Sequence, residues 1–89
     1  MNAFYARVSG RVQGVGFRYS AVREAKSLKL SGWVRNSSNG DVEVWAEGSP
    51  EALAEFLDWL HKGPEYSRID SVDAVDKAPQ GYRGFEVER

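Results

Sequence analysis

The stretch that most constrains this chain is the glycine-rich run from Gly10 to Arg18, because it joins two different periodicities. Before it, residues 4–9 alternate between apolar and polar side chains, as in a strand with one face on a core. After it, apolar residues recur at spacings of three and four, which indicates an amphipathic helix beginning at Phe17. Glycines let backbone N–H groups converge, and a helix N-terminus adds unpaired N–H groups. The run therefore predicts either a cradle for a small anion, completed by Arg18, or a plain turn with a surface arginine.

The remaining periodicity predicts an alternating order of strands and helices. Further strands are expected over residues 32–36, 41–47, 71–76 and 84–88, and helices over residues 17–28 and 50–62. The second helix has a core-facing stripe made of Leu53, Phe56, Leu57 and Leu60. Two helices cannot cover both faces of such a sheet. The order therefore predicts an α+β split βαβ sandwich, with an antiparallel-type sheet and both helices on one face, in a single domain over residues 1–89.

Composition excludes several classes of protein. The chain has no cysteine, which removes disulfides, thiolate nucleophiles and cysteine-bound metals. Its formal net charge is −1, with acids and bases mixed, so the charge does not suggest a nucleic-acid partner. No stretch has the length of a membrane span, and the first residues lack the basic and apolar regions of a signal peptide. A cytoplasmic protein with no membrane partner is therefore expected.

Few residues could carry chemistry at the glycine-rich run. It lacks the lysine of a Walker A loop, and Val12 stands where a cysteine phosphatase has its nucleophile, so the run could hold a phosphoryl group without attacking it. His61, the only histidine, falls in the last turn of the second helix, where a cation suits the helix dipole. The carboxylates of that helix, which are typical of a solvated face, are Glu51, Glu55 and Asp58. No metal or cofactor site is predicted.

Asn36 is the remaining candidate, at the end of the second expected strand and beside a hairpin loop over residues 37–40. An asparagine in this position is most often a turn residue. Alternatively, its amide can orient a water molecule through hydrogen bonds, although it cannot remove a proton. Spacing alone does not place Asn36 near Arg18.

Two long motifs resemble the signatures of the acylphosphatase family: Gly-Arg-Val-Gln-Gly-Val-Gly-Phe-Arg over residues 10–18 and Gly-Trp-Val-Arg-Asn over residues 32–36. Later segments that also fit are Gly40, Glu47–Gly48, Gly63–Pro64 and residues 84–87, so the resemblance covers nearly the whole chain. It implies a ferredoxin-like sandwich. It also implies a monomeric hydrolase, without cofactor or metal, that converts acyl phosphates (carboxyl-phosphate mixed anhydrides) to a carboxylate and orthophosphate.

The same resemblance implies roles for individual residues. Arg18 and the N–H groups of the loop would bind the phosphoryl group, and Asn36 would orient the attacking water. The implied phosphate-binding residues are Val12, Gln13, Gly14, Val15, Gly16, Phe17 and Arg18. One departure follows the first helix, where the family usually has glycine and this chain has Lys29. If the backbone there is left-handed, Lys29 costs on the order of 1 kcal/mol in stability.

Two other functions remain open at this stage. The loop could sense phosphate or carbamoyl phosphate without turnover. Alternatively, the sheet could stack bases of single-stranded RNA on outward aromatic residues such as Tyr5, Trp45 and Trp33. Glu43 and Glu47 share that polar face, which argues against RNA.

Overall fold

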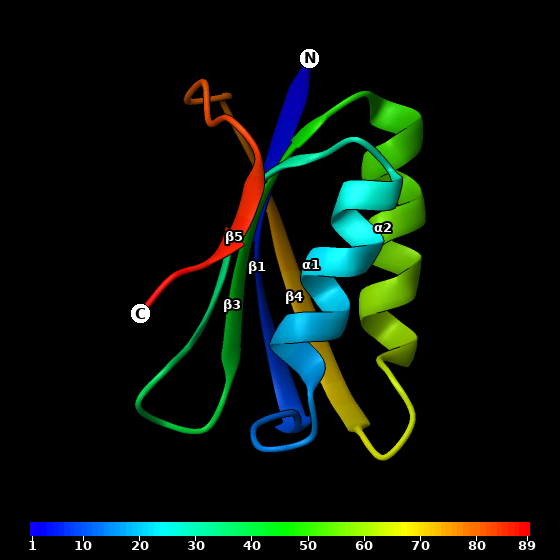
Figure 1. Ribbon diagram of the computed structural model, residues 1–89, viewed down its shortest axis with the longest axis vertical. Helices are drawn as coiled ribbons and strands as arrows, with labels where there is room; N and C mark the ends of the chain where they lie inside the picture. The colour runs from blue at the N-terminus through cyan, green and yellow to red at the C-terminus, as the bar shows by residue number, and fades with distance from the viewer.

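The computed structural model describes residues 1–89 as one five-stranded sheet with both helices packed on the same face (Figure 1). The strands are β1 (Asn2–Arg11), β2 (Ser31–Asn36), β3 (Val42–Gly48), β4 (Arg68–Lys77) and β5 (Phe85–Val87), and the helices are α1 (Phe17–Ser27) and α2 (Pro50–Lys62). The order across the sheet is β4-β1-β3-β2-β5. The predicted split βαβ sandwich, with its two helices on one face, is therefore confirmed. Neither helix has the length and apolar content that crossing a membrane requires.

The alternation read from the sequence accounts for the middle of the sheet. β1 lies between β3 and β4 and is antiparallel to both. Its residues Phe4, Ala6 and Val8 are buried under the helices. The facing residues of β3, which are buried in the same core, are Val42, Val44 and Ala46. A period of two therefore puts one complete apolar layer against the helices.

The sheet is mixed, which corrects the expectation of an antiparallel-type sheet at one edge. β5 runs parallel to β2, with Gly32 opposite Phe85 and Val34 opposite Val87. Two further backbone bonds hold it there, from Gly32 N–H to the Gly84 carbonyl and from Glu88 N–H to the Val34 carbonyl. Side chains alternate in the same way in parallel and antiparallel strands, so the periodicity of β5 carries no information on its direction.

The two helices bury faces of different size. α1 places Phe17, Ala21 and Ala25 in the core, and the two alanines let its backbone approach the sheet. α2 begins at its predicted cap, because the Ser49 hydroxyl oxygen accepts the Ala52 N–H at 3.2 Å. Its buried residues are Leu53, Phe56 and Leu60.

Leu57 is an exception to the predicted core stripe of α2. It is only partly buried, at the edge of the face that Phe56 and Leu60 bury completely. Truncation of Leu57 is therefore expected to destabilise the fold less than truncation of Leu60, for which about 2–5 kcal/mol is typical.

Lys29 has the left-handed backbone that its position suggested, with φ of 60°. Helix α1 ends in a Schellman arrangement around it, because Leu30 N–H donates to the Ala25 carbonyl and Lys29 N–H donates to the Lys26 carbonyl. Glycine is the usual residue at this place because it has no Cβ to strain.

On the outer face of the sheet, the side chain of Glu47 is less exposed to solvent than predicted. Glu47 was expected on an open polar face, yet it is only 1% exposed. Its carboxylate accepts the N–H groups of Gln80, Gly81 and Tyr82 and the indole N–H of Trp45. We call these three backbone N–H groups the Glu47 nest. It lies in the β4–β5 connection, at the end of the sheet opposite the glycine-rich run (Figure 1).

Candidate functional site

The glycine-rich run forms the connection between the end of β1 and the start of α1. Gly14 and Gly16 both have left-handed backbone, with φ of 77° and 78°. A Cβ at either position would meet nothing within 4 Å, so the backbone conformation rather than crowding favours glycine there. These two turns let consecutive N–H groups point to one side. We call the segment from Val12 to Arg18 the cradle.

The N–H groups of the cradle have no partners in the protein. No backbone or side-chain acceptor pairs with an N–H group of Val12 to Gly16, and the first hydrogen bond of α1 runs from Ser20 N–H to the Gly16 carbonyl at 3.0 Å. Gly16 caps α1 without a side-chain acceptor, and the first turn of the helix contains no acidic residue. The positive end of the helix dipole is therefore available to an anion.

A pocket of about 250 Å³ opens over this end of α1. Its lining residues come from the cradle and from the last residues of the chain: Val12, Gly14, Gly16, Phe17, Arg18, Tyr19, Val87 and Arg89. A larger hollow of about 360 Å³ is formed mainly by the first residues of β1 and the first turns of α2, and it contains no cradle residue. The contribution of Val87 and Arg89 was missed in the sequence, since it depends on the parallel pairing of β5 with β2.

The side chains of the cradle divide into two groups. Val12 and Phe17 are buried and anchor the loop to the core. Arg18 is partly buried and forms none of the ion pairs found in the protein. Its guanidinium is therefore free for an anionic ligand. Val15 packs against the core and does not line the pocket.

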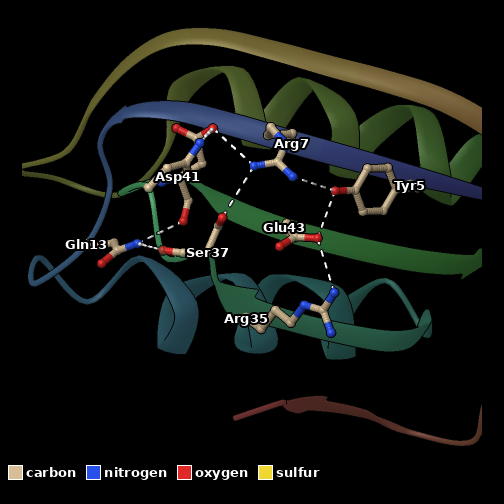
Figure 2. Close-up of polar contacts among 8 residues, drawn as sticks. Tyr5, Arg7, Gln13, Arg35, Ser37, Asp41 and Glu43 are labelled. Carbon is tan, nitrogen blue, oxygen red and sulfur yellow. Dashed lines mark hydrogen bonds and ion pairs between the residues drawn. The ribbon is translucent and has the colours of Figure 1, made fainter.

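The Gln13 side chain does not line the pocket and is bonded to the β2–β3 hairpin (Figure 2). Its Nε2 donates to the carbonyl oxygens of Ser37 and Asp41, each at 2.9 Å. Both hydrogens of this amide are thus engaged within the protein. Only the backbone N–H of Gln13 remains for the predicted binding of phosphate.

Asn36 is the last residue of β2, two residues beyond the buried Val34. Because strand side chains alternate, Asn36 is on the same face of the sheet as Val34, which is buried in the core that α1 covers. Its side-chain Oδ1 is buried and has no hydrogen-bond partner. A buried acceptor without a partner is uncommon, and a bound water is one way to satisfy it.

His61 and the outer-face carboxylates do not join the pocket. The Nδ1–H of the exposed His61 donates to the Leu57 carbonyl at 2.9 Å, within its own helix. Glu43 has a pKa below its ordinary value. Burial acts to raise this pKa, but the hydrogen bonds from Tyr5 and Arg35 lower it by more. These contacts fix Glu43 on the face of the sheet opposite the helices.

The aromatic residues of that same face are only partly available for contacts with another molecule. Trp33 is 7% exposed, and the Arg35 guanidinium lies over its ring at 4.7 Å from the centroid. Tyr5 is bound through its hydroxyl to Glu43 at 2.8 Å. Trp45 packs on the Tyr82 ring and donates its indole N–H to Glu47. The face therefore lacks a row of free rings on which bases could stack.

Comparison with known proteins agrees with the motifs. The family model described as Acylphosphatase matches residues 4–87. An acylphosphatase of Thermococcus kodakarensis is 46% identical over 93% of this chain and 91% of its own length, and one of a Nocardioides species is 50% identical over 90% and 81%. The crystal structure of acylphosphatase from Bacillus subtilis has a TM-score of 0.98 with this chain, at 37% identity and full coverage of both chains. On sequence, fold and the two motifs together, the chain belongs to the acylphosphatase family.

Proposed function

We propose that this protein hydrolyses acyl phosphates to a carboxylate and orthophosphate, with the cradle holding the phosphoryl group and a water bound to Asn36 as the nucleophile. Membership of the acylphosphatase family supports the reaction. The observation that carries the site assignment is the run of unpartnered N–H groups beside the unpaired guanidinium of Arg18. Such a group of donors matches the equatorial oxygens of a phosphoryl group in charge and in hydrogen-bonding type.

The cradle supplies most of what this reaction requires. Phosphoryl transfer passes through a loose transition state with charge spread over the equatorial oxygens, so catalysis depends on positioning and charge stabilisation. N–H groups fixed by left-handed glycines need no reorganisation during the reaction. Arg18 adds two parallel donors, which an ammonium group cannot offer.

The water is the second requirement. Asn36 Oδ1 can accept one hydrogen bond from a water, which leaves a lone pair of that water free to attack phosphorus in line with the leaving group. The new P–O bond forms as the bond to the acyl oxygen breaks, and the carboxylate leaves with the bonding electrons. The water proton passes to an oxygen of the phosphoryl group or to solvent, since a carboxylate leaving group needs little acid assistance. The proposal requires the Asn36 amide to lie within one water's reach of the cradle.

The alternatives receive less support. A sensor of phosphate or carbamoyl phosphate would use the same cradle and is separated from an enzyme only by turnover. Binding of single-stranded RNA has little support, because Trp33 is covered and Tyr5 and Trp45 are engaged with carboxylates. Action as a monomer in the cytoplasm is part of the proposal, and the absence of cysteine is compatible with it.

The test is hydrolysis of benzoyl phosphate by the wild type, Arg18→Ala, Arg18→Lys and Asn36→Ala. Arg18→Ala is expected to lower kcat/KM by roughly 10³-fold or more, with a melting temperature close to that of the wild type, because its side chain pairs with nothing in the protein. Arg18→Lys should be nearly as inactive. Asn36→Ala should lower kcat strongly, while orthophosphate still binds and competes with substrate.

The matched control is Arg11→Ala, which removes an exposed arginine at the end of β1 that does not line the pocket. Its activity should equal that of the wild type. Binding of a non-hydrolysable acyl phosphonate without any hydrolysis would identify a sensor instead. Full activity of Asn36→Ala would remove Asn36 from the mechanism.

A further inference from the structure

We propose that Gln13 is a positioning residue that holds the Asn36-bearing hairpin at a fixed distance from the phosphate cradle. This inference rests on the proposed function, because it concerns how the two halves of that site are aligned. The cradle belongs to the β1–α1 connection, and Asn36 belongs to the end of β2. Gln13 is part of the cradle, yet its side chain is bonded to the hairpin directly after Asn36.

The contact is a double tether at the base of the hairpin (Figure 2). One amide nitrogen, Gln13 Nε2, donates to the Ser37 carbonyl and to the Asp41 carbonyl at 2.9 Å each. Ser37 N–H also donates to the Asp41 carbonyl at 2.8 Å, so the same two residues close the hairpin. A shift of the Gln13 backbone would stretch both bonds at once.

The hairpin is also bonded on its other side, so the Gln13 side chain joins the cradle to a segment that β1 holds as well. From β1, Arg7 Nη1 reaches Ser37 Oγ and Asp41 Oδ2, both at 3.4 Å (Figure 2). Within the loop, Asp41 N–H donates to Asn39 Oδ1 at 3.1 Å. Hydrogen bonds from Ser9, Arg7 and Asn39 lower the pKa of Asp41, so its carboxylate stays charged in this arrangement.

Asn36 needs such support because its own acceptor atom is not held. Oδ1 of Asn36 has no partner in the protein, so no hydrogen bond to this atom orients the amide. Its place is set by the β2 backbone before it, opposite Val42, and by Ser37 after it. Gln13 is the cradle side chain that is bonded to this segment. It therefore fixes the separation between the Asn36 amide and the N–H groups of the cradle.

The test uses Gln13→Met, which keeps the length of the side chain and removes both N–H donors. A misplacement of about 1 Å in a reacting group can lower a rate by about 10²-fold. We therefore expect kcat for benzoyl phosphate to fall by roughly 10- to 100-fold. The Kd for inorganic phosphate, measured by calorimetry, should change by less than about threefold, since the cradle N–H groups and Arg18 remain.

A double variant separates alignment from simple loosening of the loop. If Gln13 acts through Asn36, adding Gln13→Met to Asn36→Ala should lower kcat by less than about threefold further. The matched control is Gln80→Met, at the Glu47 nest end of the molecule, where the exposed amide donates only to the Ala78 carbonyl at 3.3 Å. It should leave both kcat and phosphate affinity at the wild-type values.

Three results would overturn the inference. The first is a wild-type kcat in Gln13→Met, and the second is a loss of phosphate affinity equal to the loss of kcat. The third is a kcat of the double variant that falls by the product of the two single-variant factors. In each of these cases the proposed function stands, provided that the wild type hydrolyses benzoyl phosphate and that Asn36→Ala hydrolyses it much more slowly. A wild type without hydrolysis would reject the proposed function, and the inference with it.

Discussion

The two ends of the sheet each carry a loop with backbone N–H groups that donate to no backbone carbonyl, and the loops differ in what those groups contact. In the cradle, the N–H groups of Val12 to Gly16 have no acceptor in the protein. In the Glu47 nest, three consecutive N–H groups donate to one buried carboxylate. Both loops use left-handed glycine, with φ of 77° at Gly14 and 87° at Gly81. The same backbone device thus leaves its donors without an acceptor at one end and holds the fold together at the other.

The source of the anion explains this difference. Glu47 is delivered to its nest by β3, so the anion is always present and holds the β4–β5 connection. The cradle has a positive helix end and a free Arg18, and the first turn of α1 offers no carboxylate to fill it. An unfilled group of N–H donors at a pocket therefore indicates a ligand site, whereas a filled one indicates a structural clamp.

The largest expected effect on stability comes from removing the carboxylate that the Glu47 nest binds. Glu47→Ala leaves three backbone N–H groups and the Trp45 indole N–H without their acceptor, so it should destabilise the fold by about 3 kcal/mol and lower Tm by roughly 10–20 °C. Benzoyl phosphate hydrolysis at low temperature should stay near the wild-type rate. Differential scanning calorimetry measures the loss of stability.

Acetate, but not an equal concentration of chloride, should raise the Tm of Glu47→Ala more than that of the wild type. If acetate has no such effect, the nest is not an anion site.

Acid should act on the two ends differently. The pKa of Glu47 is lowered: burial acts to raise it, and the N–H groups that it accepts lower it by more. Its contribution to stability is therefore complete above its unfolded pKa of about 4.5 and is lost as the pH falls through the folded value. The loss is about 1.4 kcal/mol for each unit between the two pKa values. Urea unfolding between about pH 3 and 7 should show this slope in the wild type and less of it in Glu47→Gln.

The cradle should show no such dependence, because the mechanism uses no titrating group of the enzyme near neutral pH. We expect kcat to be flat between about pH 5 and 8. A kcat that changes steeply with pH over this range would instead show that a titrating group of the enzyme takes part in the reaction.

A matched pair of glycine substitutions should separate backbone strain from function. Gly14→Ala and Gly81→Ala each force a left-handed alanine, and neither new Cβ meets an atom within 4 Å. Each should cost about 1 kcal/mol of stability, measured by denaturant unfolding. Only Gly14→Ala should also weaken orthophosphate binding, because the strained alanine lowers the population of the left-handed loop conformation that presents the cradle N–H groups. Equal effects on binding would mean that the two loops are not functionally distinct.

The smallest expected effect is a change in stability at Lys29, where left-handed backbone strain can be measured without any bound anion. Lys29 is left-handed at the end of α1 and has no part in either group of N–H donors. Lys29→Gly should stabilise the protein by up to about 1 kcal/mol, because relief of the Cβ strain exceeds the added entropy of the unfolded chain. Thermal unfolding checks this, and an unchanged or lower Tm would contradict it.

Much of the fold follows from local pattern. Phe4, Ala6 and Val8 alternate in sequence and are buried together, and Ser49–Pro50 marks the start of α2 as expected. The direction of β5 could not be predicted, because hydrogen bonds from Gly32 and Glu88 fix it across some 50 residues. Glu47 looked exposed because its three backbone N–H donors lie more than 30 positions away in the chain.

The candidate site was predicted in outline. The glycines and Arg18 pointed to an anion cradle, and resemblance to a family added Asn36. The direction of the Gln13 side chain was not predictable, since its partners are backbone carbonyls of Ser37 and Asp41, which every residue type possesses. The place of Val87 and Arg89 in the pocket could not be predicted for a related reason, because only the pairing of β5 with β2 brings them there.

The parallel β2–β5 pair also has a consequence for how the protein gains its activity. The pocket takes Val12 and Gly14 from near the start of the chain and Val87 and Arg89 from its last three positions. Any intermediate in which β5 has not yet docked therefore has a cradle open on one side. Pairing across such sequence separations is a slow step in folding. Recovery of catalysis during refolding should therefore trail the formation of the helices, so that turnover reports the docking of β5 on β2.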